Sequence, residues 1–187
     1  MAEDQGAPEL HPLSDAPSDL ELVKSSWRKQ AYEISGGGRL FAYMDYTITG
    51  KATARSAEGT WTFSRPKGVI HRRIKVTSQD GQIRADLDLR AWKRGGMIEL
   101  GGTSYDIRTR GAVSARWRCE RDGQELFTVK EIHSLKKEKG AIKLSALGRT
   151  DPNLALLLLL TMDANHAADS ESAAAGAAAA GAAAAGA

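Results

Sequence analysis

The chain has few of the residues that mark secreted, metal-binding or membrane-spanning proteins. Among its 187 residues, Cys119 is the single cysteine and only four residues are histidines. One cysteine excludes an internal disulfide and gives no sign of an oxidising compartment. The first residues, Met-Ala-Glu-Asp-Gln, lack the charged and then apolar pattern of a secretory signal. We therefore expect a cytoplasmic protein, either free or peripheral at a membrane.

Motifs of catalysis are also missing from the sequence. It contains no nucleophile elbow, no Walker loop and no His-Glu-x-x-His zinc motif. His71 and His133 fall on different predicted strands and have no cysteine partner to complete a metal site. Asp86 and Asp88 share an outward face, where balancing nearby arginines explains them better than acid–base chemistry. We predict a non-enzymatic protein with no catalytic residue, no metal site and no cofactor.

The two ends of the chain differ in composition from its body. Residues 1–24 hold six acidic residues and one lysine, which predicts an acidic, flexible segment. Residues 167–187 are mostly alanine and glycine and form a low-complexity tail. Residues 25–166 are predicted to be one domain. Within residues 25–150, 25 basic residues face 13 acidic ones, and the net charge of +12 would attract an anionic partner.

Most of the body alternates between apolar and polar residues, which is typical of strands with one buried face. Strands with this period are predicted across residues 27–147, with a further strand at residues 20–23. Short segments containing glycine predict hairpin turns, and therefore an antiparallel sheet. These turns are expected at residues 36–38, 57–59, 79–81, 95–96, 101–102 and 121–123. About twelve strands result, at the roughly ten-residue spacing of a sandwich or a barrel.

One segment near the end of the sequence departs from this pattern. Residues 154–160, Leu-Ala-Leu-Leu-Leu-Leu-Leu, are apolar on every side, and Asp151 or Thr150 can cap a helix before them. We predict a hydrophobic helix at about residues 152–165, too short for the roughly twenty residues that span a bilayer. A sandwich core has no room for a helix about 10 Å across, whereas a barrel of more than eight strands does. The predicted fold is therefore all-β, a closed antiparallel barrel of about 12 strands that encloses this one helix.

Several short segments, taken in order, carry a resemblance to a known family. They are Gly59-Thr-Trp61-Thr-Phe63, Gly102-Thr-Ser-Tyr105-Asp-Ile107, Ala115-Arg-Trp117, Gly123-Gln-Glu-Leu126 and the helix from Asp151-Pro-Asn-Leu154 to Asp163. Together they resemble the tubby C-terminal-like superfamily, in the branch of LURP-one-related proteins and phospholipid scramblases. The resemblance covers about residues 27–165. It implies a barrel threaded by a helix and, as in tubby-type domains, phosphoinositide binding on a basic outer wall. The chain lacks the palmitoylation-type cysteines of scramblases, so lipid scrambling is not implied.

Two sets of cations are expected on the outside of the barrel. The first is a run in which several side chains can converge on one phosphate through charge-assisted hydrogen bonds. Its predicted headgroup-binding residues are Arg65, Lys67, Arg72, Arg73 and Lys75. Arg72 falls on the apolar side of its strand, which indicates a bulge or a cation near the barrel mouth. The second set is a basic stripe on neighbouring strands: Arg108, Arg110, Arg116 and Arg118.

The favoured function is binding of anionic phospholipid headgroups, with nucleic acid, RNA in particular, as the alternative partner of the same surface. Most aromatic residues alternate into the predicted core, which leaves Trp92 for stacking on bases or for entering a membrane interface. A third reading is a structural or protein-interaction domain whose acidic N-terminal segment folds back over the basic wall. No transmembrane segment is predicted, and the oligomeric state stays open.

Overall fold

A computed structural model describes residues 8–26, 31–47, 50–65, 73–88, 95–110, 116–133 and 138–166. Within these ranges the chain forms twelve strands, the 3-10 helix η1 (Leu13–Asp15) and the short helix α1 (Ala146–Arg149). The strands are β1 (Asp19–Ser26), β2 (Ala31–Gly36), β3 (Arg39–Tyr46), β4 (Ala52–Ser56), β5 (Gly59–Ser64), β6 (Arg73–Ser78), β7 (Ile83–Asp88), β8 (Gly95–Leu100), β9 (Thr103–Arg110), β10 (Arg116–Arg121), β11 (Gln124–His133) and β12 (Glu138–Leu144).

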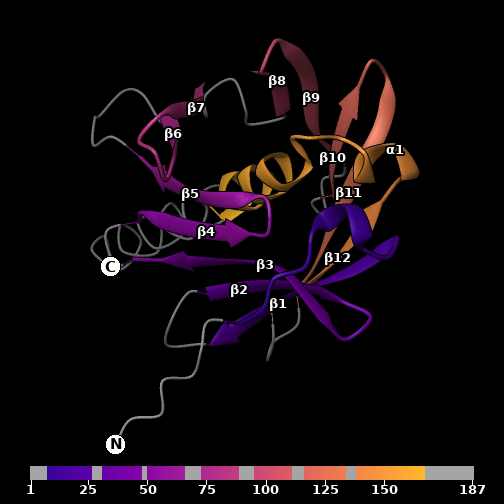
Figure 1. Cartoon of the computed structure of the whole chain (residues 1–187). Helices are drawn as coiled ribbons and strands as arrows, with labels where there is room; N and C mark the ends of the chain where they lie inside the picture. The colour runs from indigo at the N-terminus through magenta and orange to yellow at the C-terminus, as the bar shows by residue number, and fades with distance from the viewer. Residues whose placement is uncertain are drawn as a thin grey trace, which may run out of the picture.

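All twelve strands belong to one antiparallel sheet that curls into a nearly closed barrel (Figure 1). The strand order is β7-β6-β5-β4-β3-β2-β1-β12-β11-β10-β9-β8. Every pairing in the sheet joins strands that are consecutive in sequence, except that of β1 with β12, which joins the two halves of the chain. β7 and β8 form the two edges of the sheet. The predicted antiparallel barrel of about twelve strands is thus confirmed in outline, with a gap in the hydrogen bonding between β7 and β8.

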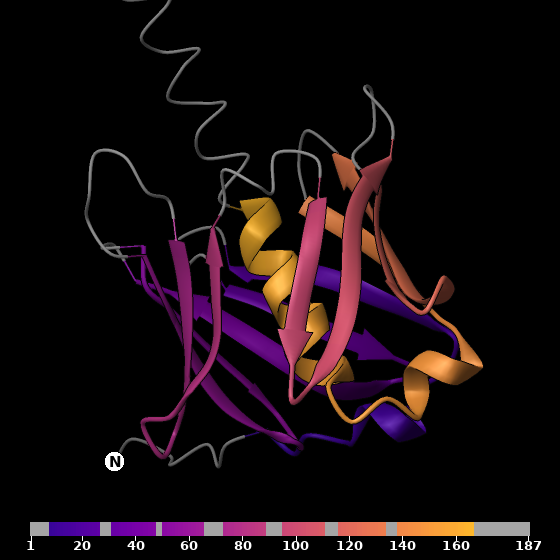
Figure 2. The same ribbon diagram turned by 90° about the horizontal axis from the view of Figure 1, so that it is seen from above.

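Residues 154–166 are helical, and every residue from 154 to 165 is buried. This C-terminal helix has no label in Figure 1, and Figure 2 shows it on the concave side of the sheet, in yellow and orange. Its leucines join one hydrophobic cluster with the inward side chains of the strands, such as Phe63, Ile107 and Ile142. Asp151 lies in the turn that precedes this helix, where its Oδ1 accepts a hydrogen bond from the backbone N–H of Asn153 at 2.9 Å. Helix and strands therefore share one core.

The predicted turns are confirmed at five of the six positions, and residues 95–96 are an exception. The turn between β10 and β11 shows why an Asp-Gly pair favours a hairpin turn. Asp122 and Gly123 both have the positive φ that such a turn requires, 51° and 73°. Gly95 and Gly96 instead begin β8 and pair with Arg108 and Ile107. Glycine tolerates strand geometry as well as turn geometry, so its presence alone does not separate the two.

Ile83 is a second correction, because its alternation with Ala85 and Leu87 predicts an inward side chain. It is 57% exposed. A register shift makes Val76 pair with Ala85 and Thr77 with Ile83, so that Arg84 is an extra residue on β7. Because of this extra residue, the side chains before and after the bulge do not follow strict alternation. Ile83, which precedes Arg84, therefore lies on the outer face while Ala85 and Leu87 lie in the core.

The barrel begins earlier than residue 25, the boundary expected from composition. β1 starts at Asp19 and occupies a central position in the sheet between β2 and β12. Before it, Leu13 of η1 is 1% exposed, and Arg39 Nη2 donates to the carbonyl of Asp15 at 2.8 Å. Residues 8–18 therefore pack against β3 and α1. The apolar residues Leu13, Ala16 and Leu20 anchor this segment in spite of its acidic composition.

Candidate functional site

The basic stripe lies on the outer face of two adjacent strands. The register of β9 and β10 places Arg118 directly opposite Arg108 and Arg116 directly opposite Arg110. Tyr105, Ile107, Trp117 and Cys119 of these strands are buried, whereas Arg108 and Arg116 are exposed and Arg118 is partly exposed, which agrees with the predicted outward alternation of these three arginines. We refer to the outer face of β9, β10 and β11 as the basic wall.

Two arginines of the basic wall are held by acids on their own strands. Arg108 Nη2 lies 2.6 Å from Asp106 Oδ2, and Arg118 Nη1 lies 3.0 Å from Glu120 Oε1. The hydrogen bond that Arg108 donates to Asp106 raises the pKa of Arg108 above its usual value. These pairs neutralise one end of the wall.

Three basic residues occupy neighbouring register positions at the other end of the wall. Arg116 lies opposite Arg110 on β9 and opposite Lys130 on β11. Both Arg116 and Lys130 are exposed, and neither forms an ion pair with the part of the chain that the structure describes. Like charges directly opposite each other on a sheet destabilise it by about 0.2–1 kcal/mol. We refer to these three register positions, Arg110, Arg116 and Lys130, as the cationic row.

The first predicted set, from Arg65 to Lys75, is divided by the structure. Lys67 and Arg72 lie outside the described residues, as does Trp92. Arg73 and Lys75 lie on β6, at register positions opposite Asp88 and Asp86 of β7. The binding role of this set stays a prediction.

Arg65, the remaining member, contacts the C-terminal helix. Its Nη2 donates to Asp163 Oδ1 at 2.8 Å and to the Asp163 carbonyl at 3.0 Å. Asp163 is 1% exposed, and its Oδ2 has no hydrogen-bond partner within the described ranges. Burial raises the pKa of Asp163, and the charge of Arg65 opposes this rise. Burial also raises the pKa of Tyr46 well above its usual value, with the Asp163 carboxylate adding to the effect.

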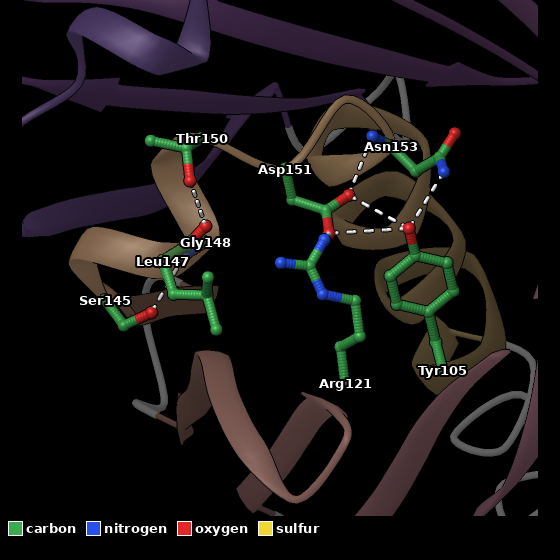
Figure 3. A network of polar contacts seen from close by, with 8 residues as sticks. All are labelled: Tyr105, Arg121, Ser145, Leu147, Gly148, Thr150, Asp151 and Asn153. Atoms are coloured by element: carbon green, nitrogen blue, oxygen red, sulfur yellow. Dashed lines mark hydrogen bonds and ion pairs between the residues drawn. The ribbon is translucent and has the colours of Figure 1, made fainter. Parts of the chain in front are cut away.

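A second polar cluster lies at the other end of this helix (Figure 3). The buried Asp151 carboxylate accepts hydrogen bonds from the Tyr105 hydroxyl at 3.1 Å and from Arg121 Nη1 at 2.5 Å. Asn153 Nδ2 in turn donates to the Tyr105 hydroxyl at 2.9 Å. Burial raises the pKa of Tyr105. Because each polar group has a partner, the cluster serves to fasten the helix start to β9 and β10.

A cavity of about 550 Å³ opens beside this cluster, between η1, α1 and the start of the C-terminal helix. Across the described residues, no group of three or more His, Cys, Asp or Glu side chains is placed to hold a metal ion. Nor, in the same residues, is any helix long and apolar enough to cross a bilayer.

The sequence predicts the arginines of β9 and β10 as a basic stripe, but it does not predict Lys130 or either cluster at the helix ends. Arg121 and Asp151 are 30 residues apart, and Arg65 and Asp163 are 98 apart. The sequence signal for these clusters is the pair of aspartates on either side of the apolar run at residues 154–160, since buried carboxylates require partners.

Comparison of the chain with models of known protein families, with curated proteins and with solved structures found no match.

Proposed function

We propose that the chain is a non-enzymatic module that binds anionic phospholipid headgroups through the basic wall. The observation that supports this most is the cationic row, in which Arg110, Arg116 and Lys130 occupy opposing register positions on β9, β10 and β11. A phosphate near this row would replace repulsion by charge-assisted hydrogen bonds. The run from Arg65 to Lys75 is the second candidate contact.

The same proposal extends to the family and to the details of the fold. We propose a tubby-like domain in which the sheet encloses the C-terminal helix as its core. The twelve-stranded order and the burial of residues 154–165 support this, together with the position of the helix after the last strand. A rigid barrel then presents the basic wall as a fixed array of charges, and the domain binds a membrane surface without entering it.

Nucleic acid is the less favoured partner of this surface. Sequence-tolerant binding of single strands uses aromatic side chains as stacking platforms beside the cations. Trp61, Phe63, Tyr105 and Trp117 are at most 8% exposed and cannot serve in this way. The basic wall offers charge without stacking, which suits a headgroup layer better than bases.

Co-sedimentation with vesicles tests the proposal. The wild type should bind phosphatidylcholine vesicles that contain phosphatidylinositol bisphosphate more strongly than phosphatidylcholine alone. Each Lys or Arg near an anionic surface contributes about 1 kcal/mol, so Arg116→Glu combined with Lys130→Glu should weaken binding by at least about tenfold. Rising salt should weaken it as well, because salt screens exposed charges.

A matched variant separates a site from a general effect of charge. Lys51→Glu with Arg55→Glu makes the same change of net charge at exposed positions around β4, far from β10 in the strand order. This control should keep most of the binding. Equal loss in both double variants, or equal binding to neutral vesicles, would contradict the proposal. Tighter binding of a labelled RNA that depends on Arg116 and Lys130 would favour the alternative partner.

A further inference from the structure

The cavity beside η1 is separate from the basic wall and has the dimensions of a small-molecule site. Its volume of about 550 Å³ falls inside the range of about 300–1,000 Å³ that such sites occupy. Three segments that are distant in sequence form its walls: η1, the turn between β4 and β5, and residues 146–155. The fold therefore builds this cavity from its tertiary packing, and a local loop does not account for it.

Apolar side chains make up most of the cavity surface. They are Pro12, Leu13, Ala146, Pro152, Leu154 and Ala155. Leu13 and Leu154 are 1% and 2% exposed and belong to the main hydrophobic cluster. The floor of the cavity is thus an extension of the core, and the apolar surface that a ligand could remove from water belongs to Pro12, Ala146 and Pro152 around it.

Most polar groups in the lining are already engaged. Glu58 Oε1 accepts a hydrogen bond from the Leu13 N–H at 2.7 Å, and Thr150 Oγ1 donates to the Leu147 carbonyl at 2.9 Å. The Asp151 carboxylate is bound by Arg121. These groups shape the walls and leave little hydrogen-bonding capacity for a ligand.

Arg149 differs from the other lining residues. It is the one cation among the described residues of the lining, and its Nη1 makes a single long contact of 3.3 Å with the Ala16 carbonyl. A guanidinium has five N–H donors, so most of the donors of Arg149 remain for a ligand. Its planar fork matches a carboxylate or a phosphate.

We propose that this cavity binds a small amphipathic anion. Its apolar chain lies over Pro12, Ala146 and Pro152, above the buried floor, and its carboxylate or phosphate group pairs with Arg149. This site does not depend on the proposed membrane function, because none of its residues belongs to the basic wall.

Calorimetric titration with decanoate, decanol and decylamine tests the proposal on the full chain. Decanoate should bind with one-to-one stoichiometry and more tightly than the other two. Arg149→Gln should weaken decanoate binding about tenfold and leave decanol binding unchanged, because only decanoate uses the charge-assisted hydrogen bonds. Decyl phosphate, titrated in parallel, distinguishes a preference for phosphate from one for carboxylate.

Two further variants act as controls. Arg39→Gln removes another guanidinium that holds the η1 segment, through the Asp15 carbonyl, but Arg39 does not line the cavity and its loss should not change affinity. Ala146→Trp places a large side chain in the cavity from an exposed position and should abolish binding of both decanoate and decanol. Equal weakening by Arg39→Gln and Arg149→Gln would overturn the proposal. So would equal affinity for decylamine and decanoate, or wild-type affinity in Ala146→Trp.

Discussion

Two aspartates are buried near the ends of the C-terminal helix, Asp151 just before its first residue and Asp163 in its last turn. Their surroundings stabilise the ionised carboxylate to different extents. Asp151 receives hydrogen bonds from Tyr105, Arg121 and the backbone of Asn153. Asp163 pairs with Arg65 through one oxygen, and Tyr46 is the other polar side chain beside its carboxylate. Burying a charge without full compensation disfavours the ionised form, which is why the pKa of Asp163 is raised.

This raised pKa predicts a specific pH dependence of stability. Between the ordinary value of 3.8 and the higher folded-state value, the folded chain keeps a proton on Asp163 that the unfolded chain has lost. The free energy of unfolding contributed by Asp163 is therefore fully present below pH 3.8 and decreases as the pH rises through this interval. Asp163→Asn does not titrate. In urea unfolding from about pH 3 to 7, the stability of wild type minus that of Asp163→Asn should fall with rising pH.

A second variant sharpens this test. Arg65 opposes the rise of the Asp163 pKa, so Arg65→Met should strengthen the decrease, with the same sign. It should also destabilise the fold at neutral pH, because it leaves a buried carboxylate without its cation. A difference between wild type and Asp163→Asn that is flat or rises with pH would show that burial does not control this carboxyl group.

The residue scale is where the sequence was least informative. Alternation correctly predicts Tyr105 and Trp117 as inward residues, and both are buried. It does not predict that Trp117 Nε1 donates to Asn165 Oδ1 at 2.9 Å, since this contact depends on how deep the helix sits relative to β10. Such partners are set by tertiary geometry, which a periodic pattern does not contain.

At the scale of elements, α1 illustrates a close approach that only glycine permits. Ser145 caps this short helix by accepting a hydrogen bond from the Gly148 N–H at 2.9 Å. A Cβ atom on Gly148 would lie 2.2 Å from the backbone oxygen of Leu126 on β11. That oxygen already accepts from the Ser145 N–H at 2.9 Å, so it is fixed in place.

We expect Gly148→Ala to lower the free energy of unfolding by about 1–3 kcal/mol, the usual cost of overpacking. Equilibrium urea unfolding measures this change. Ala146→Ser is the matched control, because Ala146 lies in the same helix at an exposed position, where substitutions usually alter stability by less than about 0.5 kcal/mol. Equal stability of Gly148→Ala and Ala146→Ser would mean that α1 shifts away from β11 without loss.

Most strands were predictable because one face of each is buried, which imposes the period of two. The errors fall at β7 and β8, the edges of the sheet. There the bulge at Arg84 exposes Ile83, and the strand start at Gly95 carries no apolar signal. An edge strand has one partner instead of two, so its sequence is less constrained than that of a central strand.

For the whole molecule, the core is one continuous cluster of helix and strands. Leu158 of the helix is fully buried in this cluster, as is Cys119 of β10, whose pKa is raised by burial. A thiol in such a place reacts only when the structure opens. Its alkylation rate therefore reports how often β10 separates from the core.

Leu158→Ala tests whether the barrel and the helix are one cooperative unit. The substitution should lower the free energy of unfolding by about 2–5 kcal/mol. If Cys119 becomes accessible only through global unfolding, its alkylation rate should rise by about 30-fold or more, in proportion to the unfolded population. Iodoacetamide labelling followed by mass spectrometry measures this rate.

The two measurements must agree for a single cooperative unit. An unchanged alkylation rate, combined with lower stability, would show that β10 opens locally without release of the helix. Fast alkylation already in the wild type would contradict the burial of Cys119.

The pairing of β1 with β12 has a consequence for synthesis on the ribosome. Every other pairing in the sheet links consecutive strands, so β1 to β7 can form hairpins as soon as they emerge. The edge of β1 must wait for β12, more than a hundred residues later, and the leucine-rich helix emerges later still. During translation the nascent chain therefore exposes the unpaired edge of β1 and the apolar face of the sheet that the helix later covers. Such a state favours aggregation and chaperone binding.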